Sequence, residues 1–297
     1  MLVAAINSQT LQADTILVID SSSDDETVEV FKHAGAKVHS ILRREFSHGG
    51  TRQLGVDMLS NAEIIIFMTQ DAVPAGPHAF EKIHQCFENS QVGATYGRQL
   101  PRSGAGPIEA HARLFNYSNS SRLTGLDDRS TMGIKAVFLS NSFAAYRRAD
   151  LLAVGGFPSH LIMGEDTYVA AKMLLAGKKI AYSAEASVFH SHNYNFREEF
   201  RRYFDAGVLH AREPWIRAQF GNAENEGLRF VTSEFGFLLR QNPFLIPAAF
   251  FRTLLKFTGF QFGLREKKLP LVVKRRLGML HAYWSDQLRD RNQASGR

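Results

Sequence analysis

Short apolar runs alternate with amphipathic segments along the first 195 residues. The run TILVID at 15–20, followed by the polar segment SSSDDET, predicts a buried strand, a loop and then a helix at 26–34. Strands are also predicted at 36–42, 63–68, 92–97, 136–146 and 179–189, with helices at 50–60 and 165–176. This alternation indicates an α/β fold with a mostly parallel sheet, and ligands at the C-terminal ends of its strands.

After residue 195 the pattern is that of helices alone. We therefore predict a first domain at 1–195 and a helical region at 196–297. The helical region holds 18 Lys and Arg residues against 10 Asp and Glu residues, a net charge of +8, although the whole chain carries only +6. A basic third beside a near-neutral body predicts an anionic partner for that third.

Composition indicates the cell compartment of the protein and the class of its anionic partner. Hydrophobic residues make up 44% and charged residues 22%, as in ordinary folded proteins. The single cysteine, Cys86, excludes an internal disulfide and suits the reducing cytoplasm. No signal peptide and no uncharged stretch of spanning length is evident. No nucleic-acid motif accompanies the basic residues, so we expect a membrane surface rather than nucleic acid.

Six segments, in this order, give the chain a resemblance to a known family. They are QTLQADTILVIDSSSDDET at 9–27, FSHGGTRQLG at 46–55, FMTQDAVP at 67–74, YRRADLLAVGGF at 146–157, GEDTYVAAKMLLAG at 164–177 and VFHSHNYN at 188–195. Together they resemble family-2 glycosyltransferases of the Rossmann-like GT-A fold, and more narrowly the bacterial rhamnosyltransferases that build O-antigen.

The resemblance implies a function and its partners. It implies inverting transfer of a sugar, L-rhamnose from dTDP-L-rhamnose, onto a polyprenyl-linked glycan acceptor in cell-surface glycan synthesis. Another nucleotide-sugar donor is an open alternative. Family members begin with a strand that helps to hold the nucleotide, and Met1 falls inside the helix after it. The first strand is thus expected to be missing, which leaves a non-catalytic nucleotide-binding remnant as a second alternative.

A diphosphate leaving group needs a cation to meet its developing charge. In the family, the turn after the strand at 63–68 carries an Asp-x-Asp pair that binds Mg²⁺ or Mn²⁺. Here Thr69 stands at the first position and Asp71 at the second, with Gln70 between them as a substrate-binding candidate. His190 and His192 follow the last strand, share one face, and are candidate further ligands. The alternatives are a turn-capping Asp71 and two structural histidines.

Inversion also needs a base for the acceptor hydroxyl. Glu165 and Asp166 open a predicted helix, where the helix dipole favours carboxylates. By resemblance Asp166 is the base and Glu165 orients a hydroxyl, although helix capping explains the pair as well.

The remaining candidates would hold the donor. Asp20 is expected to contact the base or ribose, and Asp25 to do so or to cap the next helix through Thr27. His48 and Arg52 flank paired glycines that let the backbone approach a ligand closely, so we expect them near the donor. A surface salt bridge is the alternative for Arg52.

The helical region contains an aromatic-rich segment at 243–264, PFLIPAAFFRTLLKFTGFQFGL. Its two cations, Arg252 and Lys256, lie four residues apart on one helical face and leave a broad apolar face. Basic clusters follow at 265–268 and 274–276. The pattern predicts either a helix on the inner face of the cell membrane or a core helix that packs on the sheet or on a second subunit.

Overall fold

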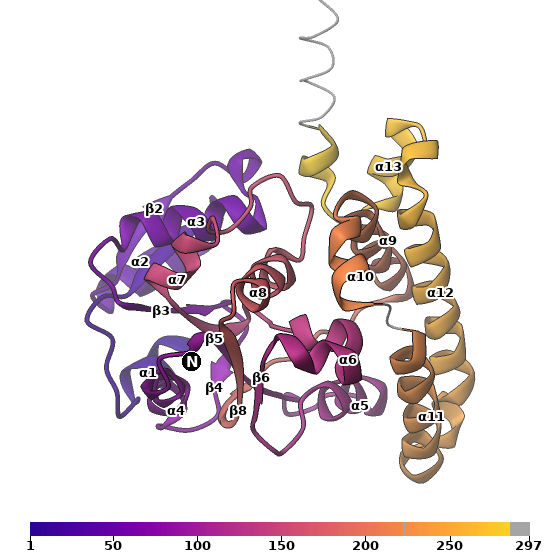
Figure 1. The fold of residues 1–297 in the computed structure, drawn as a ribbon, viewed down its shortest axis with the longest axis horizontal. Helices are drawn as coiled ribbons and strands as arrows, with labels where there is room; N and C mark the ends of the chain where they lie inside the picture. The colour runs from indigo at the N-terminus through magenta and orange to yellow at the C-terminus, as the bar shows by residue number, and fades with distance from the viewer. Residues whose placement is uncertain (222–223, 286–297) are drawn as a thin grey trace, which may run out of the picture. The chain divides into compact units, whose positions relative to one another are not determined.

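The computed structural model describes residues 1–221 and 224–285, which divide into two compact units. The first unit comprises residues 1–159 and 165–192, and the second comprises 160–164 together with the chain from 193 onward. The strands of the first unit are β1 (Leu17–Asp20), β2 (Lys37–Ser40), β3 (Ile64–Met68), β4 (Val73–Pro74), β5 (Val92–Leu100), β6 (Arg122–Thr124), β7 (Phe143–Arg147) and β8 (Lys179–Phe189) (Figure 1).

Helices connect these strands. They are α1 (Leu2–Asn7), α2 (Thr27–His33), α3 (His48–Met58), α4 (Ala79–Gln85), α5 (Pro107–Asn116), α6 (Arg129–Met132), α7 (Arg148–Ala153) and α8 (Glu165–Leu175). The predicted helices at 26–34, 50–60 and 165–176 correspond to α2, α3 and α8.

The strands form two sheets, and their pairing is mixed. A six-stranded sheet has the order β3-β7-β5-β8-β4, with β6 also on β8, while β1 and β2 pair separately. Only β1–β2 and β5–β8 are parallel pairs; the other four are antiparallel. The expected mostly parallel sheet is corrected on this point. The apolar run of β7 shows burial on both faces, which parallel strands share, but it carries no information about strand direction.

The predicted strand at 136–146 is also corrected. Its first part is a short 3₁₀ helix (Gly133–Val137) and a loop, and only its second part is β7. Three consecutive polar residues, Ser140, Asn141 and Ser142, interrupt the apolar run. The side chains of Ser140 and Asn141 bond to the side chains of Gln99 and Glu165, and the backbone ladder of β7 starts only at Phe143.

The first unit has its core against the sheet. Phe143, Ile83 and Val188 are fully buried there, with α4 packed on β8. The buried central strands β5, β7 and β8 hold the loops at their ends in fixed positions. Those loops carry the candidate catalytic residues.

The second unit consists of helices in the part of the chain that the structure describes (Figure 1). They are α9 (Phe196–Arg212), α10 (Pro214–Phe220), α11 (Glu224–Gln241), α12 (Ile246–Leu264) and α13 (Leu271–Leu277). A cap by Asn195 starts α9, because its side chain accepts from Glu198 N while the Glu198 carboxylate accepts from Asn195 N.

Glycines allow α9 and α12 to pack closely. A Cβ placed on Gly263 would lie 2.1 Å from the Phe204 carbonyl oxygen, and one on Gly259 would lie 2.5 Å from that of Phe200. Both obstacles are backbone atoms, so the helices would have to separate to admit a side chain. The pairing of α9 with α12 therefore depends on these small residues.

We predict that Gly263→Ala destabilises the second unit by about 1–3 kcal/mol, because the added methyl group overpacks the helix crossing. Gly236→Ala in α11 is the matched control, since a Cβ there meets no atom within 4 Å. The control should leave stability unchanged or raise it by up to about 1 kcal/mol through helix propensity. Urea unfolding followed by circular dichroism measures both. Equal stabilities for the two variants would contradict the close crossing.

Candidate active site

The turn after β3 presents Asp71. Thr69 N donates to the Ser142 carbonyl oxygen at 3.3 Å, and Thr69 Oγ1 donates to Asp71 Oδ1 at 2.6 Å. Thr69, which occupies the first position of the expected acidic pair, thus orients the remaining carboxylate. Gln70, between them, is exposed in the turn. Asp71 Oδ2 is left to face the chain that follows β8.

Two histidines meet Asp71 from the end of β8. His190 Nε2 lies 3.3 Å from Asp71 Oδ2, and His192 Nδ1 lies 3.6 Å from the same oxygen. One ligand atom from each of the three residues falls within 4.8 Å of the others. His190 is buried and His192 is half-buried. The structure therefore brings together the three residues predicted to bind a metal.

Gln99 in β5 determines which ring nitrogen of His190 carries a hydrogen. The Gln99 side chain is buried, with 1% of the residue exposed. Gln99 Oε1 accepts from Arg113 Nη1 at 2.6 Å, and Gln99 Nε2 donates to Ser140 Oγ at 2.9 Å. A guanidinium only donates, so the amide atom that faces Arg113 is the oxygen. The same oxygen lies 2.8 Å from His190 Nδ1, which must then carry a hydrogen.

With Nδ1 as the donor, His190 Nε2 points its lone pair at Asp71. Within the described chain this buried nitrogen has no hydrogen-bond partner. Two acceptors at 3.3 Å need a positive charge between them, either a proton or a metal cation. If a proton lies between them, His190 and Thr69 both donate hydrogen bonds to the Asp71 carboxylate. Burial alone would raise the pKa of Asp71, but these bonds outweigh it and hold the pKa well below its usual range. Imidazole and carboxylate donors placed in this way fit a divalent cation.

Arg102 adds positive charge beside this cluster. Its Nη2 donates to the Asp71 carbonyl oxygen and lies 3.8 Å from Asp71 Oδ2. Its backbone N–H donates to Ser191 Oγ, which ties the chain after β5 to the chain after β8. The guanidinium is partly exposed and accessible to an anionic ligand.

The predicted carboxylate pair opens α8. Glu165 is buried and forms an ion pair with Arg52 at 2.7 Å, and its Oε1 accepts from Asn141 Nδ2 at 3.0 Å. Tyr146 O–H donates to Asn141 Oδ1 at 2.7 Å and so fixes the orientation of that amide. Arg52 therefore holds a buried carboxylate, and the surface salt bridge considered for it is corrected.

The two carboxylates differ in ionisation. Burial opposes a charge on Glu165, but Arg52, His48 and the bond from Asn141 outweigh it and lower its pKa. Burial and the charge of Glu165 raise the pKa of Asp166 to about 6. Asp166 is half-buried; Oδ1 accepts from Thr167 N and Oδ2 from Asn141 N. A carboxylate with a raised pKa and partial access suits a general base.

The loop 140–142, in the first part of the predicted strand, links the Asp71–histidine cluster to the carboxylate pair of α8. Ser140 accepts from Gln99, which bonds to His190; Asn141 bonds to Glu165 and Asp166; and Ser142 accepts from Thr69. Three successive residues thus connect, through Gln99 and Thr69, the metal-type cluster to the acid pair.

The remaining candidates have local partners. Both Asp20 carboxylate oxygens lie 3.2 Å from Ser23 N, in the turn after β1. Asp25 is exposed, and its Oδ1 accepts from Thr27 N at 3.0 Å, the predicted capping role. His48 starts α3, and Arg52 Nη1 donates to its carbonyl oxygen.

Gly49 corrects the expected role of the paired glycines. A Cβ on Gly49 would lie 1.8 Å from the Pro158 carbonyl oxygen, so this glycine admits protein backbone. A glycine in the sequence shows only that some group can approach the backbone closely. It does not show whether that group is a ligand or, as here, another part of the chain.

Several site residues were not predicted. Gln99, Arg102 and Asn141 bond to predicted residues, whereas Arg113 bonds to Gln99 and Tyr146 to Asn141. Asn141 carried a visible signal, because it interrupts an apolar run, whereas Gln99 follows the end of the strand predicted at 92–97. The others depend on contacts between residues far apart in the sequence.

Comparisons with known proteins identify relatives of this chain. Residues 2–155 match the model of glycosyl transferase family 2. The chain is 48% identical to O-antigen chain rhamnosyltransferase RfbN of Salmonella typhimurium and 46% identical to WbaN of Salmonella anatum, in each case covering 95% of this chain and 90% of the relative.

A solved structure confirms the predicted GT-A fold. The mannosyltransferase PcManGT of Pyrobaculum calidifontis, in complex with GDP-Man and Mn²⁺, superposes with a TM-score of 0.52 at 16% identity. The match covers 95% of this chain and 79% of that one.

We predict that Gln99→Leu weakens Mn²⁺ binding about 10–100-fold, as is typical when a residue that orients a metal ligand is lost. Without the acceptor, His190 is free to place its hydrogen on Nε2 and lose its lone pair. Gln99→Glu is the matched variant, because it keeps an acceptor for both His190 and Arg113. Calorimetric titration with Mn²⁺ compares them. Wild-type affinity in Gln99→Leu would contradict the assigned tautomer.

Proposed function

Because this chain belongs to glycosyl transferase family 2, we propose that it is an inverting rhamnosyltransferase of O-antigen synthesis. In this proposal it moves L-rhamnose from dTDP-L-rhamnose to a polyprenyl-linked glycan. The observation that carries the chemistry is the loop 140–142, which joins a cation-type cluster to a carboxylate with a raised pKa. The 46–48% identity to two O-antigen chain rhamnosyltransferases supports the donor sugar.

The proposed reaction is a single displacement. The acceptor hydroxyl oxygen attacks the anomeric carbon as the bond from that carbon to the β-phosphate oxygen breaks, and dTDP leaves with the electron pair. Asp166 takes the hydroxyl proton. Glu165, ionised and fixed by Arg52 and Asn141, keeps a negative charge beside Asp166 that favours proton uptake.

The diphosphate is proposed to bind at the other end of the loop. Asp71, His190 and His192 would hold Mn²⁺ or Mg²⁺, which when bound neutralises charge on the departing diphosphate. Two imidazoles beside one carboxylate favour Mn²⁺ of these two ions. Arg102 would contact the phosphates directly. Asp20, at the end of β1, His48 and Gln70 remain proposed donor contacts.

This function is tested by donor consumption with a panel of nucleotide sugars. We expect dTDP release from dTDP-L-rhamnose to exceed release from UDP-hexoses and GDP-mannose. Asp166→Asn should lower kcat about 10²–10⁴-fold with little change in donor affinity, because only proton transfer is lost. Wild-type kcat/KM should fall below pH 6, where Asp166 becomes protonated and can no longer act as a base.

The outcomes separate the parts of the proposal. Preferred consumption of another donor would reject rhamnose and keep the transferase. No consumption of any donor would favour a non-catalytic nucleotide-binding protein. Wild-type turnover in Asp166→Asn would reject the base.

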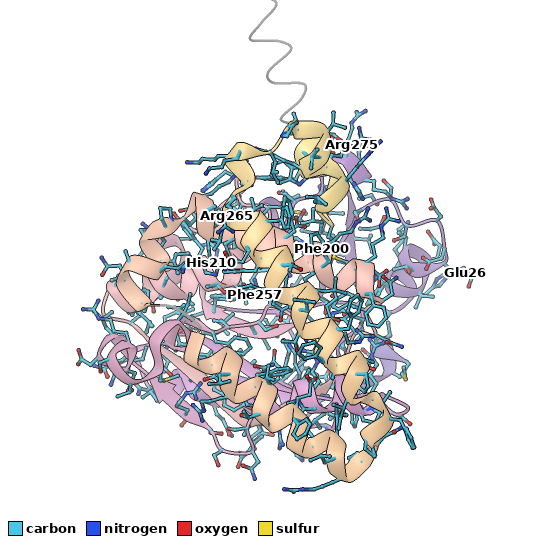
Figure 2. The ribbon with its side chains drawn as sticks, turned by 90° about the vertical axis from the view of Figure 1, so that its right-hand side faces the viewer. Glu26, Phe200, His210, Phe257, Arg265 and Arg275 are labelled. Atoms are coloured by element: carbon cyan, nitrogen blue, oxygen red, sulfur yellow. The ribbon has the colours of Figure 1, made fainter. Side chains whose placement is uncertain are left out.

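We also propose that the second unit lies on the inner membrane face, on the evidence of α12. Arg252 and Lys256 point into the protein, where both pair with the buried Glu199 of α9, at 2.7 and 3.1 Å. The opposite face exposes Phe250, Leu254 and Phe257; Phe257 is 61% exposed (Figure 2). This arrangement reverses that of an ordinary surface helix.

An outward apolar stripe with basic residues nearby matches helices that lie in the membrane interface. Lys267, Lys268 and Arg275 are exposed in the segments after α12 and would attract anionic lipid. No helix in the described ranges is long and apolar enough to cross a membrane. One face of α12 packs on α9, where a sheet or a second subunit was the predicted packing partner, and the other face is available to lipid.

Vesicle flotation tests this placement. The double variant Phe250→Ser/Phe257→Ser should lose at least about tenfold in binding to phosphatidylglycerol vesicles, because each ring contributes apolar burial. The control Val30→Ser/Leu114→Ser removes two exposed apolar side chains from the first unit. Equal flotation of both double variants would rule out the α12 face as the lipid contact.

A further inference from the structure

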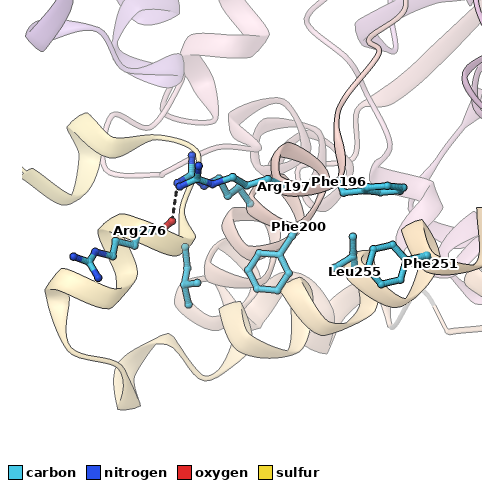
Figure 3. A pocket seen from close by; sticks show the side chains of 8 residues that line it. Phe196, Arg197, Phe200, Phe251, Leu255 and Arg276 are labelled. Carbon is cyan, nitrogen blue, oxygen red and sulfur yellow. Dashed lines mark hydrogen bonds between the residues drawn. The ribbon is translucent and has the colours of Figure 1, made fainter. Parts of the chain in front are cut away.

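A groove of about 430 Å³ runs between α9, α12 and α13 in the second unit. Its apolar lining consists of Phe196, Phe200, Phe251, Leu255 and Leu277. In Figure 3, Arg276 lies at one end, Phe251 at the other, and Phe200 and Leu255 between them. Phe196 and Phe251 meet edge to face at 5.1 Å, yet they remain 42% and 46% exposed. The groove is therefore an apolar surface that the described chain does not cover.

Three arginines complete the lining: Arg197, Arg201 and Arg276. Arg201 Nη2 donates to the Arg276 carbonyl oxygen at 3.0 Å and thereby ties α9 to α13 (Figure 3). Arg197 and Arg276 are exposed, and neither pairs with an acidic side chain in the described part of the chain. Two guanidinium groups are thus available at an apolar groove, a combination that suits a ligand with an anionic head and an apolar chain.

We propose that this groove binds the isoprenyl diphosphate end of the lipid-linked acceptor, a proposal that rests on the acceptor class given above. The diphosphate pairs with Arg197 and Arg276, and the first isoprene units lie along Phe200, Leu255 and Phe251. The volume falls in the range of small-molecule pockets, about 300–1,000 Å³, so it accepts the head of such a lipid and leaves the distal chain outside.

The shape of the site argues against two simpler ligands. Free diphosphate would gain nothing from five apolar side chains. A flat anionic bilayer needs exposed cations and apolar side chains, but it does not need a concave groove between three helices. The exposed stripe of α12 already provides a bilayer contact, whereas the groove offers room for one lipid molecule.

The test uses geranylgeranyl diphosphate in detergent micelles as the probe, with the full chain. Arg197→Glu/Arg276→Glu reverses the two available charges and should lower probe affinity at least tenfold. Arg229→Glu/Arg240→Glu makes the same change in net charge on α11 and should bind as wild type. Inorganic diphosphate should bind wild type at least a hundredfold more weakly than the probe. Binding is measured by calorimetry and folding by circular dichroism.

The proposed lipid site would be rejected if Arg197→Glu/Arg276→Glu bound the probe as tightly as wild type. It would also be rejected if both double variants lost the same probe affinity, or if inorganic diphosphate bound as tightly as the probe. Equal loss would indicate attraction to net positive charge alone. The binding assay requires no donor sugar, so it can fail while rhamnose transfer succeeds. If the chain bound the probe but transferred no rhamnose, the proposed function would be contradicted and the proposed lipid site would not.

Discussion

The approach of His190 Nε2 to Asp71 Oδ2 is the interaction on which the site depends. Arg113 sets the orientation of Gln99, Gln99 sets the hydrogen on His190 Nδ1, and the remaining nitrogen then faces a carboxylate at 3.3 Å. Two acceptors repel each other unless a proton or a metal cation lies between them. A requirement for positive charge is therefore built into the protein where the leaving diphosphate is proposed to bind.

The loop 140–142 links this charge to proton transfer. Its residues bond to the Gln99 network, to the α8 carboxylates and to the β3 turn. In the proposed displacement, the group that neutralises the leaving diphosphate and the base that removes the acceptor proton must be correctly spaced. A short loop held at three successive residues can keep that spacing. The buried Glu165–Arg52 pair adds a second restraint, since loss of either partner would leave a buried charge unpaired.

Much of the fold was predictable from the sequence, because apolar runs and helix signals are local. Most predicted strands and helices of the first unit correspond to observed elements, and Asp71, His190 and His192, which the sequence grouped as candidate ligands, lie together in the structure. Strand direction was not predictable, since an apolar run is the same read as parallel or antiparallel. Gln99 and Arg113 were not predictable either, because their importance comes from each other and from His190. Likewise, the inward direction of Arg252 and Lys256 depends on Glu199, more than fifty residues earlier in the chain.

We propose that the positive charge between Asp71 and His190 comes from the ion that also meets the donor diphosphate. Pulsed EPR of Mn²⁺ bound with dTDP can test this, because nitrogen and phosphorus couple to the ion only as close neighbours. We expect histidine nitrogen coupling and phosphorus coupling in the same complex, with the nitrogen coupling reduced in His190→Ala. Phosphorus coupling with no histidine nitrogen coupling in the wild-type protein would contradict it.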